Sequence, residues 1–267
     1  MALVLPPLKF KLKPICCSSS PATSHFQCRP AVILPGLGNN SGDYQRLQLT
    51  LKDYGVPTVV AEVSRFDWLR NAAGLVDSNY WRATLRPRPV LDWYFSRMND
   101  AIQKAKEFTP GGKLSLIGHS AGGWLARVYM EEFGSSDISL LLTLGTPHLY
   151  IQGARFFGNS NVDVDSTVAI DTDQPISEVA TVDNKTISTA TSTTFRARIV
   201  GQGYKQVCGL ADVWGDGVVP EVSAHLEGAL NISLDGVYHS PVGSDDALRP
   251  WYGSPAVVEK WIHHLLD

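Results

Sequence analysis

Residues 118–122 read Gly-His-Ser-Ala-Gly, a Gly-x-Ser-x-Gly pentapeptide whose central hydroxyl, that of Ser120, could act as a nucleophile. The pentapeptide alone is a weak signal, and its neighbours give it weight. A β-prone apolar run at residues 113–117 precedes it, and residues 123–130 read as a helix with one buried face. A strand, a sharp turn and a helix in this order predict a nucleophile elbow, in which the flanking glycines leave room for a strained serine.

A serine hydroxyl is a poor nucleophile at neutral pH, so it needs a histidine base and an acid that fixes the tautomer of that histidine. In an elbow of this kind the acid and then the histidine follow the serine along the chain. Asp216 lies between two glycines, where a tight turn would present its carboxylate, and it is the predicted acid. Asp212 and Asp235 are the alternatives.

The predicted base is His239, because it lies in a loop directly after a short strand expected at residues 229–234. Its position allows the ring to fold back over Ser120. The histidines that fit this rule less well are His119, His148, His225, His263 and His264. We expect the histidine before the serine to point elsewhere, the one at 148 to cap or pack beneath the site, and the two in the closing helix to be exposed.

Attack on a carbonyl places negative charge on its oxygen, and two backbone N–H groups are needed to stabilise it. One donor is predicted at Ala121, directly after the nucleophile, and the other at Leu37, in the loop after the first strand. Both are inferred from position, since such donors leave no side-chain signature. This chemistry needs no cofactor and no metal, and we predict none.

Short apolar runs alternate with helical patterns along the chain, which predicts an α/β fold with a mostly parallel central sheet and helices on both faces. Strands are expected at residues 30–35, 57–63, 113–117, 138–144 and 229–234, and further helices at 41–54 (capped by Ser41), 91–108 and 257–266. Ligands bind beyond the carboxyl ends of the strands in such sheets, and Ser120 is expected at one of those ends.

Residues 149–194 are rich in Asp, Ser, Thr, Gly and Asn and show no long helical periodicity. They predict a polar lid over the site or a loop insertion. Only residues 194–200 read as a strand that could hold Asp216 in place.

Composition narrows the class of protein. Of 267 residues, 44% are hydrophobic and 18% are charged, enough to bury a large core in one domain. A net charge of −3 predicts no basic face for nucleic acid or anionic lipid. No apolar run reaches the roughly 18 residues that span a bilayer, so no transmembrane segment is predicted.

The first 42 residues contain no acidic side chain and are basic and rich in hydroxyl groups. This composition is typical of an organelle transit peptide, and the serines favour the plastid. A secretory signal is the alternative, but the positive residues follow the apolar start instead of preceding it. We predict a plastid transit peptide at residues 1–28, a single domain at residues 29–267, and a location in the chloroplast, either in the stroma or associated with a membrane.

Four segments make the chain resemble the α/β-hydrolase superfamily, and within it the lipases and the GPI inositol-deacylase-like chloroplast hydrolases of plants. They are residues 34–38 (Leu-Pro-Gly-Leu-Gly), 118–122, 144–148 (Leu-Gly-Thr-Pro-His), and 216–220 (Asp-Gly-Val-Val-Pro) with 238–240 (Tyr-His-Ser). The resemblance implies an α/β-hydrolase fold, a triad of Ser120, Asp216 and His239, and an oxyanion hole of Leu37 and Ala121.

Two departures from the family pattern stand out. Pro35 occupies the position where lipases usually have a histidine. The family also has a helix and a central strand between residue 148 and the acid, which the sequence here does not display, so a shortened form is an open alternative.

Together these features predict a serine hydrolase that cleaves carboxylic esters of an apolar, lipid-like substrate through an acyl-enzyme. A thioesterase or acyltransferase with the same triad is one alternative, and a catalytically weak, shortened form that acts as a binding protein is another. The expected partners are a small-molecule ester or lipid and, transiently, plastid membranes, with no nucleic acid.

Overall fold

The computed structural model describes residues 29–82, 85–149, 178–184, 204–205, 208–210 and 212–266. The transit peptide predicted for residues 1–28 lies outside these ranges, as do most of the insertion predicted at 149–194 and the strand predicted at 194–200.

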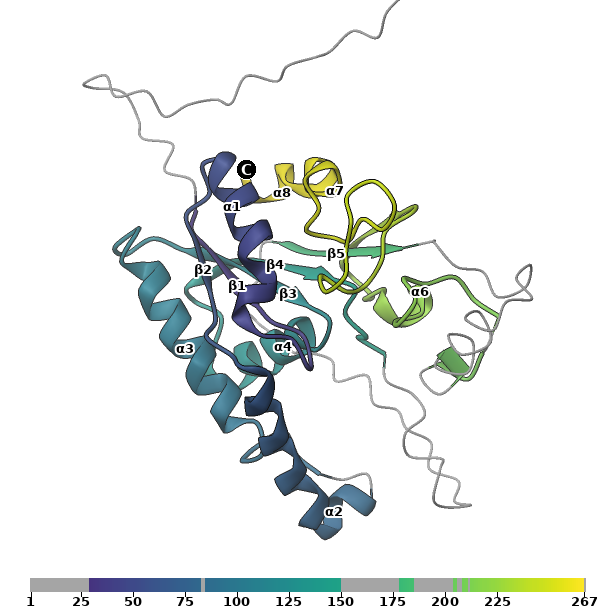
Figure 1. The fold of residues 1–267 in the computed structure, drawn as a ribbon. Coiled ribbons are helices and arrows are strands. Elements are labelled where there is room, and N and C mark those ends of the chain that lie inside the picture. The colour runs from purple at the N-terminus through teal and green to yellow at the C-terminus, as the bar shows by residue number, and fades with distance from the viewer. Residues whose placement is uncertain are drawn as a thin grey trace, which may run out of the picture.

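Six described strands form one sheet in the order β2-β1-β3-β4-β5-β6, and every neighbouring pair is parallel (Figure 1). The strands are β1 (Ala31–Leu34), β2 (Thr58–Val60), β3 (Leu114–His119), β4 (Ile138–Leu144), β5 (Glu178–Asn184) and β6 (Leu230–Leu234). The predicted parallel α/β fold is therefore confirmed. Because all the strands run the same way, the loops that follow them meet at one edge of the sheet.

Strand β5 corrects the expectation for residues 149–194. Residues 178–184 form no lid or loop; they pair with β4 on one side and β6 on the other. The sequence Glu-Val-Ala-Thr-Val-Asp-Asn lacks the continuous apolar run that marks β4, so its strand character was missed. A strand is therefore present between residue 148 and Asp216, where the family pattern has its central strand.

Helices cover both faces of the sheet (Figure 1). They are η1 (Ser41–Tyr44), α1 (Gln45–Asp53), η2 (Arg65–Val76), α2 (Ser78–Trp81), α3 (Asp92–Lys106), α4 (Ala121–Phe133), α6 (Glu221–Ala224), α7 (Pro255–Trp261) and α8 (His263–Leu266), where η denotes a 3-10 helix. Apolar side chains of α1, α7 and α8 pack with Ile33 and Ile117 on one face, and those of α3 and α4 pack with Val32 and Leu116 on the other. Successive strand residues thus point to opposite cores, which explains why these strands are apolar throughout.

The helix predicted at residues 41–54 begins differently from the expectation. Asn40, not Ser41, is the cap: its side chain accepts a hydrogen bond from the Asp43 N–H (3.2 Å), and the Asp43 carboxylate accepts one from the Asn40 N–H (2.9 Å). Ser41 is instead bound to the chain after β2, where its hydroxyl contacts the Ala61 carbonyl (2.9 Å). This contact ties the loop after β1 to its neighbour at the carboxyl edge.

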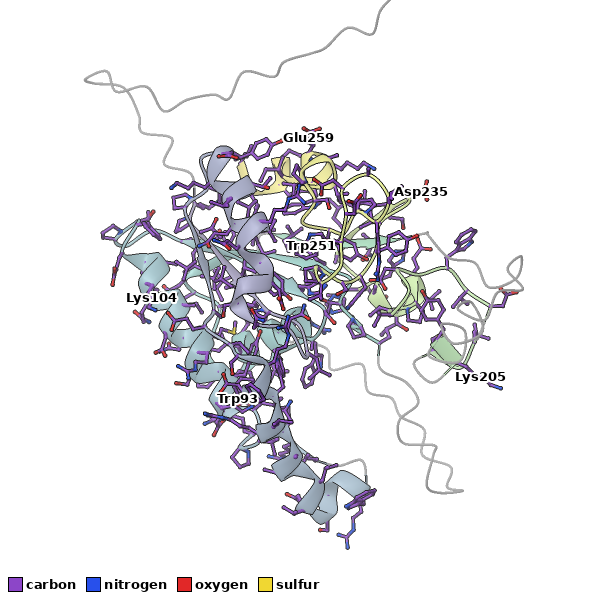
Figure 2. The ribbon with its side chains drawn as sticks, in the orientation of Figure 1. Trp93, Lys104, Lys205, Asp235, Trp251 and Glu259 are labelled. Carbon is purple, nitrogen blue, oxygen red and sulfur yellow. The ribbon has the colours of Figure 1, made fainter. Side chains whose placement is uncertain are left out.

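Helices η2 and α2 form an arm, residues 65–81, that follows β2 and runs away from the carboxyl edge of the sheet toward the bottom of the view (Figure 1). Its base is aromatic. The rings of Trp68 and Trp93 pack edge to face with their centroids 5.2 Å apart, and the centroids of the Trp68 and Tyr94 rings are 5.3 Å apart. Trp93 marks the place where the arm meets α3 (Figure 2).

Candidate active site

Ser120 lies at the turn between β3 and α4 with φ 52° and ψ −127°. Among the described residues it is the one non-glycine with positive φ. Such a conformation is costly for a residue with a Cβ atom and is typical of functional turns. The Ser120 N–H donates to the Leu144 carbonyl at 2.9 Å, so the last residue of β4 helps to hold the turn.

Three glycines around Ser120 are required by close approach of the backbone. A Cβ atom on Gly118 would lie 2.3 Å from the Gly123 Cα, and one on Gly122 would lie 2.3 Å from the Leu34 carbonyl oxygen. A Cβ atom on Gly123 would lie 2.2 Å from the Thr146 hydroxyl. Helix α4 is thereby packed directly on the strand ends, as the predicted elbow requires.

The Gly-Thr-Pro-His segment after β4 supports the same turn. The Thr146 hydroxyl donates a hydrogen bond to the Ser120 carbonyl at 2.8 Å. His148 is buried, with Nδ1 3.2 Å from an Arg127 nitrogen and Nε2 3.1 Å from the Thr143 hydroxyl. Burial, together with the nearby charge of Arg127, lowers the pKa of His148 to about 3, so this ring is neutral.

Asp216 lies in a tight turn and is buried, 2% exposed. Its Oδ1 accepts hydrogen bonds from the N–H groups of Val218 (2.9 Å) and Val219 (2.8 Å). Its Oδ2 accepts from the Tyr252 hydroxyl at 2.9 Å. Burial acts to raise the pKa of Asp216, but the neighbouring His239 and the two N–H donors outweigh it and hold the pKa below its usual value.

His239 follows β6 and contacts Asp216 twice. Its Nδ1 lies 2.6 Å from the Asp216 Oδ2, and its backbone N–H donates to the Asp216 carbonyl at 3.1 Å. A carboxylate can only accept, so Nδ1 carries the proton and the lone pair of a neutral ring is on Nε2. The predicted acid and base are thus brought together, whereas no hydrogen bond joins Ser120 to His239 among the described residues.

His119 does not point away from the site, contrary to expectation. Its Nε2 lies 2.8 Å from the His239 carbonyl oxygen, and its Nδ1 lies 2.7 Å from the Tyr44 hydroxyl. The carbonyl can only accept, so Nε2 carries the proton and Nδ1 accepts from Tyr44. Burial, reinforced by the proximity of His239, lowers the pKa of His119 to about 3.

Tyr44 connects this histidine to the loop after β1. Its hydroxyl donates to His119 and accepts from the Gly36 N–H (2.8 Å) and the Asn39 side-chain amide (2.9 Å). Tyr44 and Tyr252 were missed by sequence reasoning, because their partners lie 75 and 36 positions away. No local pattern marks either residue.

The loop after β1 lies against the nucleophile. A Cβ atom on Gly36 would lie 2.8 Å from the Cβ of Ser120. The next residue is Leu37, whose side chain is 64% exposed, and Ala121 is the first residue of α4. Among the described residues neither backbone N–H donates a hydrogen bond.

The alternative acids and bases differ from Asp216 and His239 in their burial or their contacts. Asp212 and Asp235 are exposed, and His225 is half-buried with Nε2 3.9 Å from Glu221. His263 is exposed as expected. His264 is buried, which corrects its predicted exposure.

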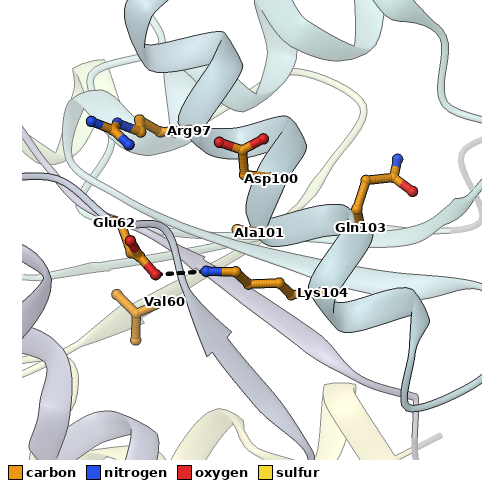
Figure 3. A pocket seen from close by; sticks show the side chains of 7 residues that line it. All are labelled: Val60, Glu62, Arg97, Asp100, Ala101, Gln103 and Lys104. Carbon is orange, nitrogen blue, oxygen red and sulfur yellow. Dashed lines mark hydrogen bonds and ion pairs between the residues drawn. The ribbon is translucent and has the colours of Figure 1, made fainter.

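A separate hollow of about 250 Å³ lies between β2 and α3 (Figure 3). Its lining is mostly charged or polar, and Glu62 pairs with Lys104 at 2.6 Å across it. None of the predicted site residues lines this hollow. In the part of the chain that the structure describes, no group of three or more His, Cys, Asp or Glu side chains is arranged to hold a metal, and no helix is long and apolar enough to cross a membrane.

Part of the chain matches a known family model. Residues 88–205 match the PGAP1-like alpha/beta domain. The matched segment contains Ser120 but neither Asp216 nor His239. Comparison with curated proteins gives no significant match.

The chain is similar, at low sequence identity, to several solved structures. Polyneuridine aldehyde esterase is 20% identical with a TM-score of 0.32, over 45% of this chain and 41% of that one. A methylesterase from Arabidopsis is 22% identical with a TM-score of 0.28, and the match covers 46% of this chain and 45% of that one. A predicted CIB-like hydrolase from Thermoplasma acidophilum is 9% identical with a TM-score of 0.40, and the match covers 92% of this chain and 87% of that one. The chain spans less than half the length of each of the first two.

Proposed function

We propose that the chain is a serine hydrolase of the α/β-hydrolase superfamily that cleaves carboxylic esters of an apolar, lipid-like substrate; the parallel α/β sheet and the match of residues 88–205 to the PGAP1-like alpha/beta domain support this proposal. The observation that carries the proposal is the 2.6 Å contact between the His239 Nδ1 and the Asp216 Oδ2, at the same sheet edge as a strained Ser120. A buried acid–imidazole pair beside an elbow serine is the arrangement that acyl transfer through a serine requires.

In the proposed reaction the Ser120 oxygen attacks the ester carbonyl carbon while His239 Nε2 takes the hydroxyl proton. Asp216 keeps the ring in the required tautomer and stabilises the imidazolium. The proton then passes to the leaving alkoxide, the alcohol departs, and an acyl-serine remains. Water, deprotonated by the same Nε2, attacks the acyl-serine and releases the carboxylic acid and Ser120.

The N–H groups of Ala121 and Leu37 are the proposed donors to the carbonyl oxygen as it becomes negative. Their support is position: Ala121 is the first residue of α4, and the loop that carries Leu37 touches Ser120 through Gly36. The missing hydrogen bond between Ser120 and His239 agrees with a site that tightens when substrate binds, since catalytic hydrogen bonds are often long or misaligned without it.

We further propose an acyl-lipid or prenyl-type ester as the substrate class and the plastid as the location. The support for the location is the basic, hydroxyl-rich composition of residues 1–28. An ester of this kind resides in a lipid phase, so transient contact with plastid membranes forms part of the proposal.

Substitution of the nucleophile tests the proposal. Ser120→Ala is expected to reduce hydrolysis of short p-nitrophenyl esters to background and to abolish labelling by a fluorophosphonate, which reacts only with an activated serine. Ser136→Ala, which alters an exposed serine in the turn after α4, is the matched control and should retain both activities. Unchanged turnover in Ser120→Ala, or a parent chain that neither hydrolyses esters nor takes up the label, would refute the assignment.

A further inference from the structure

Helix η2 carries an apolar stripe on its exposed side. A 3-10 helix has three residues per turn, so residues spaced by three share a face. Four residues with this spacing form the stripe: Phe66, Leu69, Ala72 and Leu75. Phe66 is 81% exposed and Leu69 is 69% exposed, and the stripe is about 18 Å long at a rise of about 2 Å per residue.

The opposite face of η2 is packed, so the orientation of the stripe is fixed. Trp68 is buried, Asn71 accepts a hydrogen bond from the Trp93 indole at 2.9 Å, and a Cβ atom on Gly74 would lie 3.1 Å from Leu85. These three residues also share the spacing of three. The helix cannot turn its apolar side inward without losing these contacts.

The end of the arm extends the apolar surface. Val76 is 90% exposed, and Trp81 presents most of its ring to solvent while its indole N–H donates to the Leu75 carbonyl at 3.0 Å. A tryptophan with its polar N–H satisfied and its ring exposed is typical of side chains that enter the boundary of a lipid layer.

The charge around the arm is opposite in sign to that of the whole chain. Residues 65–92 contain five arginines, three aspartates and no lysine or glutamate, in a chain with a net charge of −3. Two of the arginines, Arg82 and Arg86, are exposed and form no ion pair among the described residues. Apolar side chains accompanied by arginine on a surface helix favour binding to anionic lipid.

The arm is also attached to the candidate active site. The Trp68 indole N–H donates to the Asn39 carbonyl at 2.9 Å, two residues beyond Leu37. The arm therefore begins next to the loop that is proposed to bind the oxyanion, at the edge of the sheet where Ser120 lies.

We propose that the arm, residues 65–81, is a docking surface for an anionic lipid layer, into which Phe66, Leu69 and Leu75 insert. Binding would place the candidate active site beside its ester in the layer. The presence of an ester substrate in the layer rests on the proposed function, whereas the binding of the arm to the lipid layer does not.

The test separates binding from hydrolysis by using the full chain with Ser120→Ala. We expect it to co-sediment with phosphatidylcholine vesicles that contain phosphatidylglycerol, and less with vesicles of phosphatidylcholine alone. Leu69→Ser in this background is expected to lower the apparent affinity about tenfold, and a triple variant with Phe66→Ser and Leu75→Ser more, because binding scales with the apolar area inserted. Leu248→Ser alters a leucine that is 85% exposed elsewhere and should leave binding unchanged.

A second measurement checks the charges. Arg82→Gln with Arg86→Gln is expected to remove most of the preference for the anionic vesicles and to reduce the salt dependence of binding. With Ser120 restored, the stripe variants should hydrolyse a soluble short ester as fast as the parent, which excludes misfolding.

Three results would overturn the inference: no vesicle binding by the parent, equal binding by the stripe variants, or a dimer of the parent that Leu69→Ser converts to a monomer. The last result would assign the stripe to a second copy of the chain. Vesicle binding without hydrolysis of any ester would leave the docking surface intact and count against the proposed function alone.

Discussion

Tyr252 and His239 donate to the same oxygen of Asp216, Oδ2, at 2.9 and 2.6 Å. The other oxygen accepts two backbone N–H groups. The buried carboxylate therefore has four donors around it, and its orientation toward the imidazole is fixed from all sides. An acid held in this way keeps its charge, which agrees with the direction of its pKa shift.

Removal of one donor should weaken this arrangement measurably. Tyr252→Phe deletes a hydrogen bond to a buried charge, and we expect the free energy of unfolding to fall by about 2 kcal/mol. The pKa of Asp216 should rise, and ester hydrolysis should decrease about tenfold or less because the bond to His239 remains. Urea unfolding and kcat measure the two effects. Tyr54→Phe, at a half-buried tyrosine outside the site, serves as control, and equal stability of the two variants would contradict the role of Tyr252.

The neutral ring of His119 predicts a loss of stability in acid. Its pKa is about 3 in the folded chain and 6.5 when unperturbed, so the unfolded chain takes up a proton as the pH falls below 6.5 while the folded chain does not. Unfolding is then favoured by acid, and this histidine alone should cost about 2 kcal/mol between pH 8 and pH 5.

His119→Gln isolates this contribution, because glutamine cannot titrate. Urea unfolding at several pH values should show a shallower dependence on pH in His119→Gln than in the parent. The comparison uses the slope with pH, so a constant loss of stability from the substitution does not affect it. Parallel curves for the two proteins would show that the ring is not held neutral.

Gly145 lies so close to the Asp216 carboxylate that a side chain at this position would collide with it. Its φ is +55°, and a Cβ atom there would lie 2.6 Å from the Asp216 Oδ2 and 2.8 Å from the Tyr252 ring. Gly145→Ala should therefore displace Asp216 from His239 and lower kcat about 100-fold, because small displacements of catalytic groups are costly.

Gly55→Ala provides the matched control for Gly145→Ala. Gly55 also has positive φ (+81°), but a Cβ atom there would meet nothing within 4 Å. That variant should lose about 1 kcal/mol of stability from backbone strain and keep its activity. A similar kcat for both variants would show that strain, not contact with Asp216, causes the effect.

The parts of the fold that sequence could predict are those with a strong local signal. Strand β4 has the bounds expected for it, because seven consecutive residues face cores on both sides of the sheet. The turn at Ser120 was predicted because its glycines are needed within a few residues of the serine. Chain order predicts Asp216 and His239 as acid and base, and the structure places the two side chains in contact.

The parts that sequence could not predict depend on distant partners. Strand β5 contains Glu178, Thr181 and Asp183, and pairing with two neighbouring strands, not its own composition, makes it a strand. The role of His119 depends on Tyr44 and on a carbonyl 120 residues away. The apolar stripe on η2 has a local signal, since its residues recur every third position, but this spacing is the period of a 3-10 helix and not that of an α-helix or a strand.

The hydrogen bond from Trp68 to Asn39 has a mechanical consequence. Asn39 is also bound through its side chain to the hydroxyl of Tyr44, which fixes the Gly36 N–H next to Ser120. A force applied to the arm is thus transmitted through one indole to the rim around the serine. A change in the tilt of η2 is therefore expected to shift the loop that holds the Gly36 N–H, without any direct contact between the arm and Ser120.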